Sequence, residues 1–118
     1  MSTFSISAKK NEDIQVLELI GELDAHTAPE LEASITTLIQ QEQFKIVVNF
    51  SGLDYISSAG LGVFMAYIED VRGLGGDIKL TSMKPSVYNV FDLLGFPTLY
   101  DILDTDGEAF NRFKTDNN

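Results

Sequence analysis

Apolar and polar residues alternate in two short stretches near the start of the chain, 3–8 and 14–19, with a polar stretch at 9–13 between them. A period of two is typical of strands that bury one face. Two such stretches joined by a short polar segment favour a β-hairpin. The chain is therefore expected to begin with an antiparallel pair of strands.

The next apolar pattern has helical spacing and follows a loop predicted at residues 21–26. Four apolar residues recur on one side of this predicted helix, which should run to about Gln40: Leu31, Ile35, Leu38 and Ile39. Just before them, residues 27–30 match a capping box, in which the Thr27 hydroxyl and the Glu30 carboxylate each accept a hydrogen bond from an N–H group at the helix start. A proline inside this quartet is tolerated, because N–H groups of the first turn have no intrahelical partner.

Residues 45–50 are β-branched and almost continuously apolar, as in a strand buried on both faces. After a short connection at 51–54, the segment 55–62 is interpreted as a strand-to-helix turn that leads into the longest predicted helix. The apolar side of that helix is formed by five residues: Leu61, Phe64, Met65, Ile68 and Val71. Three glycines follow, Gly73, Gly75 and Gly76, and they suit the positive φ that helix ends often need.

A further strand and a shorter helix are predicted next. Residues 77–81 alternate polar and apolar side chains, which indicates a strand. Pro85 is well placed to open a helix that ends at Gly95. Four apolar residues of this helix are expected to face inward: Val87, Val90, Phe91 and Leu94.

The last segment predicts a weak strand at residues 99–103 and one more helix. Asp106 is expected to cap that helix, which should run through Phe113 with Phe110 and Phe113 as its apolar anchors. The polar tail at 114–118 is expected to fray.

The resulting order, β-β-α-β-α-β-α-β-α, predicts an α/β fold with a mixed sheet of four or five strands and about four helices. The opening hairpin is antiparallel, whereas the later crossovers require parallel neighbours. The chain of 118 residues is expected to form one domain, 1–118. Sheets of this kind place their sites beyond the carboxyl ends of the strands, where the turn at 55–62 is expected.

Composition narrows the possible functions. The chain has no cysteine, which excludes disulfides and thiolate metal sites. Its formal net charge of −10 would repel nucleic-acid phosphates and anionic membranes, and it favours a protein partner with basic residues. The first five residues lack a basic region and an apolar signal core, and no apolar run approaches the roughly 20 residues that span a bilayer. We therefore expect a soluble cytoplasmic protein without membrane insertion.

Two adjacent hydroxyls, Ser57 and Ser58, stand at the strand-to-helix turn. A serine at such a place commonly caps the helix by accepting a hydrogen bond from an unpaired N–H group. Alternatively, one hydroxyl caps while its neighbour points outward at the positive end of the helix dipole, where a phosphate would be stabilised. Gly60 and Gly62 are costly inside a helix and indicate that something approaches the backbone closely. Ser57 is the better placed cap, which leaves Ser58 as the candidate for modification.

The sequence offers little support for catalysis. Neither the G-x-S-x-G motif of a nucleophile elbow nor the lysine-containing loop of nucleotide hydrolases is present. A triad of Ser58, His26 and Asp24 is conceivable, because His26 is the only imidazole, but nothing in the sequence fixes its geometry. The carboxylates are dispersed, as on a solvated acidic surface. We therefore expect no enzyme activity, no cofactor and no metal.

Three motifs together resemble the STAS domains of bacterial anti-sigma factor antagonists. They are G-E-L-D at 21–24, V-N-F-S-G-L-D-Y-I-S-S-A-G-L-G at 48–62, and a glycine pair at 75–76 before a strand. They occur at the family's spacing, and the similarity covers nearly the whole chain. The resemblance implies a STAS fold and a role in partner switching.

In that family, the antagonist binds an anti-sigma factor that is also a serine kinase, and this frees the sigma factor. The kinase then phosphorylates a serine at the start of the second helix and is released. Ser58 matches that serine, with Ser57 as second choice because it stands where family members often carry Asp; Ala59 also replaces a frequent hydroxyl residue. The implied partner-binding residues are Asp24, Ser57, Ser58, Ala59, Gly60 and Leu61.

The resemblance further implies a serine phosphatase as second partner. The negative charge predicts no direct binding of nucleic acid, and we expect a monomer or weak dimer. Two other functions stay open. The chain could be a STAS-like adaptor subunit of a signalling or transport assembly whose hydroxyls only cap the helix, or a small enzyme that uses Ser58 and His26.

Overall fold

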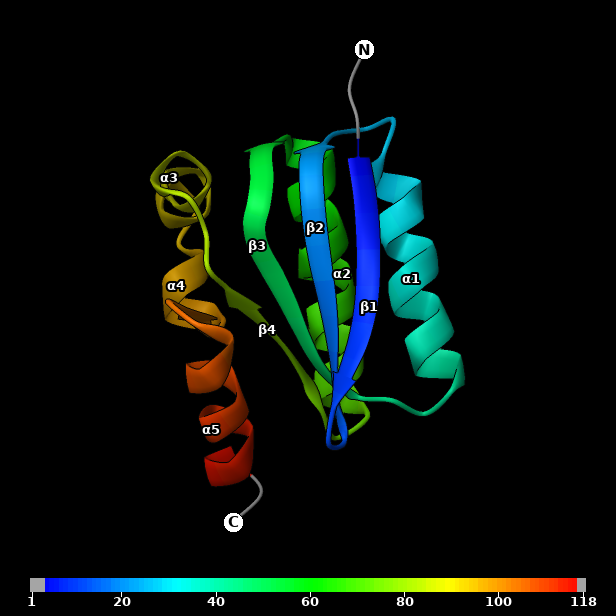
Figure 1. Ribbon diagram of the computed structural model, residues 1–118. Helices are drawn as coiled ribbons and strands as arrows, with labels where there is room; N and C mark the ends of the chain where they lie inside the picture. The colour runs from blue at the N-terminus through cyan, green and yellow to red at the C-terminus, as the bar shows by residue number, and fades with distance from the viewer. Residues whose placement is uncertain (1–3, 117–118) are drawn as a thin grey trace.

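The fold is built on a five-stranded mixed sheet with strand order β1-β2-β3-β4-β5 (Figure 1). The computed structural model describes residues 4–116, so Thr3 of the first predicted strand and residues 117 and 118 of the predicted tail lie outside the described residues. The strands are β1 (Phe4–Asn11), β2 (Ile14–Leu23), β3 (Lys45–Ile56), β4 (Asp77–Thr81) and β5 (Ile102–Leu103). β1 pairs antiparallel with β2, and β2 to β5 are mutually parallel. The predicted hairpin and the α/β fold with a mixed sheet are confirmed.

The helices cover the two faces of the sheet unequally. α1 (Ala28–Gln40) and α2 (Ser58–Gly73) lie behind the sheet in Figure 1, while α5 (Asp106–Asp116) packs on the opposite face. α3 (Pro85–Leu93) joins the α2 layer, because Phe91 packs against both Phe50 of β3 and Phe64 of α2. α4 (Phe96–Leu99) follows directly. Residues 4–116 thus contain five helices where about four were predicted, and α4 is the additional one.

Two hydrophobic clusters hold these layers together. The larger one lies between the sheet and α1 to α4, and it contains a continuous series of ring contacts with centroids 5.1 to 6.2 Å apart: Phe50, Phe64, Phe91, Phe96 and Tyr100. The smaller one lies under α5 and consists of Ile14, Val16, Val47, Ala109 and Phe113. Tilted and edge-on aromatic pairs of this kind contribute about 0.5–1.5 kcal/mol each beyond their buried area. The larger cluster therefore fixes the position of α2 on the sheet.

Two segments that were predicted to be connections, at 21–26 and 51–54, belong wholly or partly to strands, so the prediction was wrong there. Gly21 to Leu23 continue β2 where a loop was expected, and β3 runs on through residues 51–56. Local composition favoured turns there, but Gly21 pairs with Leu53 and Leu23 with Ile56 in the parallel ladder. Register shifts in this ladder absorb the irregular sequence, as β-bulges do. The carboxyl ends of β2 and β3 therefore lie side by side.

Two side chains predicted to face the core are exposed. Met65 is 51% and Leu94 59% exposed. The inward stripe of α2 is already filled by its other apolar residues, and Met65 falls beside it. Leu94 lies past the last residue of α3, where the chain leaves helical spacing before Gly95 at φ 77°. The predicted strand at 99–103 is reduced to the two residues of β5.

The start and end of α5 also differ from the prediction. The cap is Thr105, whose hydroxyl accepts a hydrogen bond from the Glu108 N–H at 3.1 Å. Asp106 instead accepts hydrogen bonds from Asn49 of β3 and Thr81 of β4, and so ties the helix start to the sheet. The helix extends to Asp116, three residues beyond the predicted end.

Candidate functional site

The structure brings the motif at 21–24 and the turn at 55–62 together at the carboxyl ends of β2 and β3. The Ser57 N–H donates a hydrogen bond to the carbonyl oxygen of Leu23 at 2.9 Å, and Asp24 follows Leu23 directly. β2 and β3 end side by side there, so the Asp24 loop and the Ser57–Ser58 turn are neighbours at the carboxyl ends of parallel strands. Open α/β sheets usually have their binding sites beyond the carboxyl ends of the strands.

Ser57 caps α2, as predicted. Its backbone is extended (φ −98°, ψ 173°), and its hydroxyl accepts a hydrogen bond from the Gly60 N–H at 3.4 Å. Ser58 is the first residue of α2, and its side chain is exposed. Within residues 4–116, no acceptor takes the N–H of Ser58 or Ala59. A group attached to Ser58 would therefore meet free donors and the positive end of the helix dipole.

The two glycines of this turn have different roles. A Cβ on Gly60 would lie 2.8 Å from Cγ of Leu23 and 3.0 Å from Cγ1 of Ile56. Gly60 is thus needed because the core, not a ligand, approaches its backbone. Gly62 faces open space, with no atom within 4 Å of an added Cβ. The close approach inferred from the sequence is therefore confirmed at Gly60 as internal packing and is not seen at Gly62.

The Asp24 carboxylate organises its own loop. Its Oδ1 accepts hydrogen bonds from the N–H groups of His26 at 2.9 Å and Thr27 at 3.1 Å. The Thr27 N–H, followed by that of His26, holds the pKa of the Asp24 carboxyl below its ordinary value. The carboxylate is half-buried at the sheet edge and stays charged at neutral and mildly acidic pH.

The capping box predicted at residues 27–30 is wrong. Thr27 has a helical backbone (φ −99°, ψ −16°), and no side chain caps the start of α1. Its hydroxyl instead donates to the Glu22 carbonyl and accepts from the Asp24 N–H, both at 2.9 Å. Thr27 therefore closes the Asp24 loop and does not cap the helix.

Thr27→Ala is expected to lower the free energy of unfolding by about 1 kcal/mol, because it leaves the Asp24 N–H and the Glu22 carbonyl without their partner in a partly buried loop. Urea denaturation of the two proteins measures the difference. Thr27→Ser keeps the hydroxyl and should lose much less. Equal losses in the two variants would show that the methyl group and not the hydroxyl stabilises the loop.

The six predicted partner-binding residues divide into two groups. Asp24 and Ser57 are half-buried, and Ser58 and Ala59 are exposed, so these four are accessible to another molecule. Gly60 and Leu61 are buried, which limits them to supporting the turn from within.

Sequence reasoning missed two exposed apolar side chains, Tyr55 shortly before this turn and Met65 farther along α2. Tyr55 and Met65 are each 51% exposed. Aromatic and methionine side chains are enriched at protein interfaces. For Tyr55 a signal was present, because alternation along β3 turns it outward when its neighbour Ile56 faces the core.

No hydrogen-bonded triad joins Ser58, His26 and Asp24 in the described part of the chain. His26 is exposed, and Asp24 binds the backbone N–H of His26 and not its ring. The geometry that nucleophilic catalysis requires of these three side chains is therefore not formed here.

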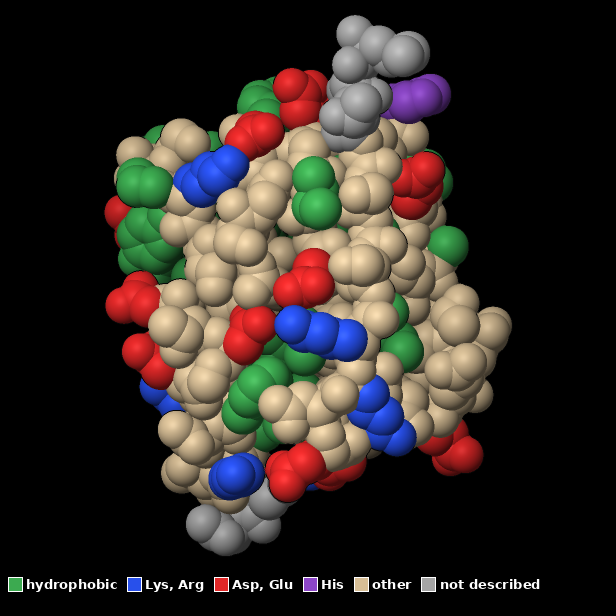
Figure 2. Space-filling model, in the orientation of Figure 1, with side chains coloured by type: hydrophobic (Ala, Val, Ile, Leu, Met, Phe, Trp, Pro, Cys, Tyr) green, Lys and Arg blue, Asp and Glu red, His purple; other side chains and the backbone are tan. Residues whose placement is uncertain are grey.

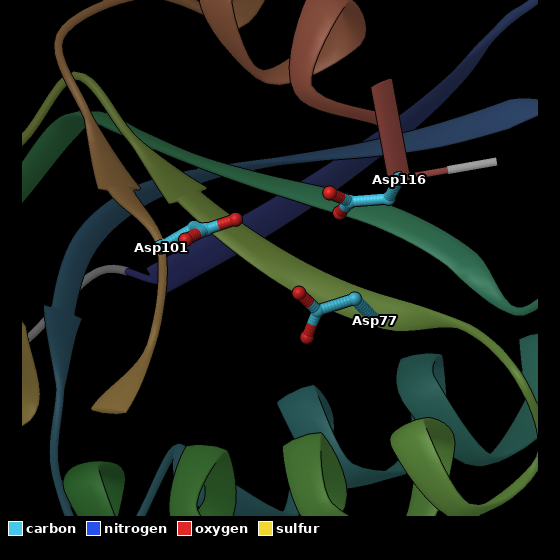
Figure 3. A group of neighbouring side chains, drawn as sticks. All are labelled: Asp77, Asp101 and Asp116. Atoms are coloured by element: carbon cyan, nitrogen blue, oxygen red, sulfur yellow. The ribbon is translucent and has the colours of Figure 1, made fainter. Parts of the chain in front are cut away.

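Three carboxylates converge on one point elsewhere in the fold. Asp77 and Asp116 come from β4 and the end of α5, and Asp101 directly precedes β5; Figure 3 shows the three facing one another. Lys79 is fully buried, and its Nζ lies 3.0, 2.7 and 2.8 Å from the three. Burial by itself lowers the pKa of Lys79, but the carboxylates outweigh it and raise that pKa. The lysine ammonium thus occupies the place that a metal ion would take.

No helix among residues 4–116 is long and apolar enough to cross a membrane.

Comparison with known protein families identifies the family of this chain. The model of the STAS domain matches residues 5–109. The chain belongs to the STAS domain family. The resemblance seen in the three sequence motifs is thereby confirmed.

Relatives of this STAS domain include anti-sigma factor antagonists. The anti-sigma-B factor antagonist of Bacillus subtilis is 32% identical over 99 residues, which span 83% of this chain and 89% of the relative. The Bacillus cell fate determinant SpoIIAA, an anti-sigma factor antagonist, has been solved in unphosphorylated and phosphorylated forms. Each is 27% identical to this chain, with TM-scores of 0.72 and 0.71; the alignments cover 95% and 93% of this chain and 98% of SpoIIAA. An antagonist from Mycobacterium paratuberculosis has the same fold, with a TM-score of 0.88, 20% identity and 95% coverage of both chains.

Proposed function

We propose that this STAS domain is an anti-sigma factor antagonist that phosphorylation of Ser58 switches off. The proposal rests on the different environments of two hydroxyls at the start of α2. The Ser57 hydroxyl caps the helix, whereas the Ser58 side chain is exposed and makes no cap. A relative, SpoIIAA, exists in phosphorylated and unphosphorylated forms. The active form would bind an anti-sigma factor that is also a serine kinase, and a serine phosphatase would restore that form in the cytoplasm.

The charge of the site supports a basic protein partner. Asp24 follows β2, and Asp54 lies near the end of β3, where it pairs with Lys84. Figure 2 shows acidic side chains gathered at the upper end of the visible face, where β2 and β3 end. Such a surface attracts basic residues of a protein and repels nucleic acid.

Phosphorylation would release the partner through charge and size. A phosphoserine adds about −1.5 to −2 charge and three acceptor oxygens. At Ser58 the phosphate would be stabilised on the free protein by the N–H groups of the first turn, by roughly 0.3–1 kcal/mol. In a closed interface the same dianion would need to be desolvated beside Asp24, which disfavours the complex. The modification thus favours the unbound state.

Capture of the chain's partner from its native cell tests the function. We expect the tagged chain to retain an anti-sigma factor, and the purified chain to displace the sigma factor from that protein. Addition of ATP should then place one phosphate on the chain and end the binding. Retention of transport or signalling subunits without an anti-sigma factor would instead establish the adaptor function.

Asp24→Asn is expected to weaken binding of the captured anti-sigma factor about threefold to fivefold, because a charge at the border of an interface contributes up to about 1 kcal/mol. Asparagine keeps the oxygen that accepts from His26 and Thr27, so the loop and the denaturation midpoint should change little. Asp24→Lys would also break these hydrogen bonds and is the less selective change. Isothermal titration measures the affinity, and an unchanged value would remove the Asp24 charge from the interface.

A further inference from the structure

The proposed function involves the carboxyl ends of β2 and β3, but not the surface beside β4 and β5. β2 and β3 end together, next to Asp24 and Ser57, whereas β4 and β5 end level with Asn49 of β3, before that strand ends at Ile56. At about 3.3 Å per residue, this stagger sets Asp104 roughly 20 Å back from the end of β3 along the strands. The Lys84–Asp54 ion pair spans this stagger, because Lys84 follows β4 and Asp54 lies near the end of β3.

A pocket opens beside Lys84, whose chain neighbours Met83 and Pro85 both line it. It has a volume of about 300 Å³ and lies between the outer side of α3 and the short strand β5. Five of its lining residues are apolar: Met83, Pro85, Tyr88, Ile102 and Leu103. The volume is at the lower end of the range for small-ligand pockets. It therefore suits a single side chain better than an extended molecule.

β5, the last strand in the sheet order, forms one wall of the pocket. β5 has two residues and pairs with β4 on one side, and within residues 4–116 no strand pairs with its other side. The Tyr88 side chain is 37% exposed over the opening, and Figure 2 shows hydrophobic side chains at the upper left of the molecule, over α3. A concavity that offers several apolar side chains beside polar ones can serve as an anchor point for a protein partner.

Charge at the pocket indicates what enters it. Asp104 lines the opening and is exposed, and in the described residues its carboxylate takes part in no hydrogen bond or ion pair. Asn89 is the other polar lining residue. Lys84, between the lining residues Met83 and Pro85, is already paired with Asp54. A partner side chain with a neighbouring Lys or Arg would complement this acidic rim.

We infer that the anti-sigma factor inserts an apolar side chain into the pocket between α3 and β5, with a basic residue of its own against Asp104. The binding surface then runs from Asp24 and Ser58 across Lys84 to the pocket. This inference rests on the proposed function. It assigns the pocket as the anchor of the complex, at a distance from the phosphorylated hydroxyl.

The experiment fills the pocket and measures binding to the anti-sigma factor captured as described above. Asn89→Trp places an indole at the pocket wall and should raise the dissociation constant at least about tenfold, as loss of an anchor contact does. Asp104→Asn should raise it about threefold and reduce its dependence on salt. Both positions are exposed, so denaturation midpoints should stay near that of the wild type.

Matched substitutions elsewhere serve as controls. Asn111→Trp on α5 and Asp70→Asn on α2 change exposed residues away from this edge, and both should bind as the wild type does. Equal affinity of Asn89→Trp and wild type would overturn the inference while leaving the proposed function intact. Equal weakening by Asn89→Trp and Asn111→Trp would overturn it as well. If the wild type itself binds no anti-sigma factor, the proposed function fails, and the inference fails with it.

Discussion

Ser58→Ala is expected to abolish phosphorylation completely. With the cognate kinase and ATP, intact-mass spectrometry should show one added phosphate on the wild type and none on the variant. Ser58 is exposed and makes no cap, so its loss should leave the denaturation midpoint nearly unchanged. Without the phosphate, the variant should stay bound to the kinase after ATP is added.

Ser57→Ala is the matched control, because it removes the neighbouring hydroxyl. It should still gain a single phosphate, and it should lose about 0.5–1 kcal/mol of stability with the cap to Gly60. A phosphate on Ser58→Ala would move the acceptor to another residue. A phosphate on neither the wild type nor Ser57→Ala, with any serine kinase of the host, would favour the adaptor function.

Lys79→Met is expected to lower the free energy of unfolding by about 3 kcal/mol. Methionine has a similar shape, but it leaves three carboxylates around a buried apolar group, and removal of one partner from a buried ion pair costs about 3–5 kcal/mol. The low end applies, because Arg72 still pairs with Asp77 and Arg112 with Asp101. Urea denaturation at neutral pH measures the loss.

Lys84→Met is the control, since Lys84 also pairs with an aspartate, Asp54, but at the surface. Its loss should cost less than about 1 kcal/mol. The pKa of Lys79 is raised, so its contribution is fully present below the ordinary lysine pKa and is lost only as the pH rises through the raised value. The difference between wild type and Lys79→Met should therefore be constant from neutral pH up to the ordinary lysine pKa and shrink in strong alkali. A difference that disappears near neutral pH would contradict this account.

The burial of Lys79 could not be predicted from the alternation of polar and apolar residues along its strand. The alternation at 77–81 predicted a strand with one polar face, and β4 is indeed a strand, yet all five of its residues are buried. The polar face is covered by α5, whose Asp116 and Phe113 lie against Lys79. A partner 37 positions away in the chain leaves no local signal.

The sequence by itself determined the α/β order, the hairpin, the capped turn at Ser57 and the exposure of Ser58. Each of these depends on neighbouring residues, through the periods of 2 and 3.6 and the free N–H groups of a helix start. Tertiary structure alone decided that Thr27 closes the Asp24 loop, that Gly60 meets Leu23 and Ile56, and that a pocket opens beside β5. These features arise where segments far apart in the chain meet, because a hydrogen bond or a steric contact depends on distance in space and not on spacing along the sequence.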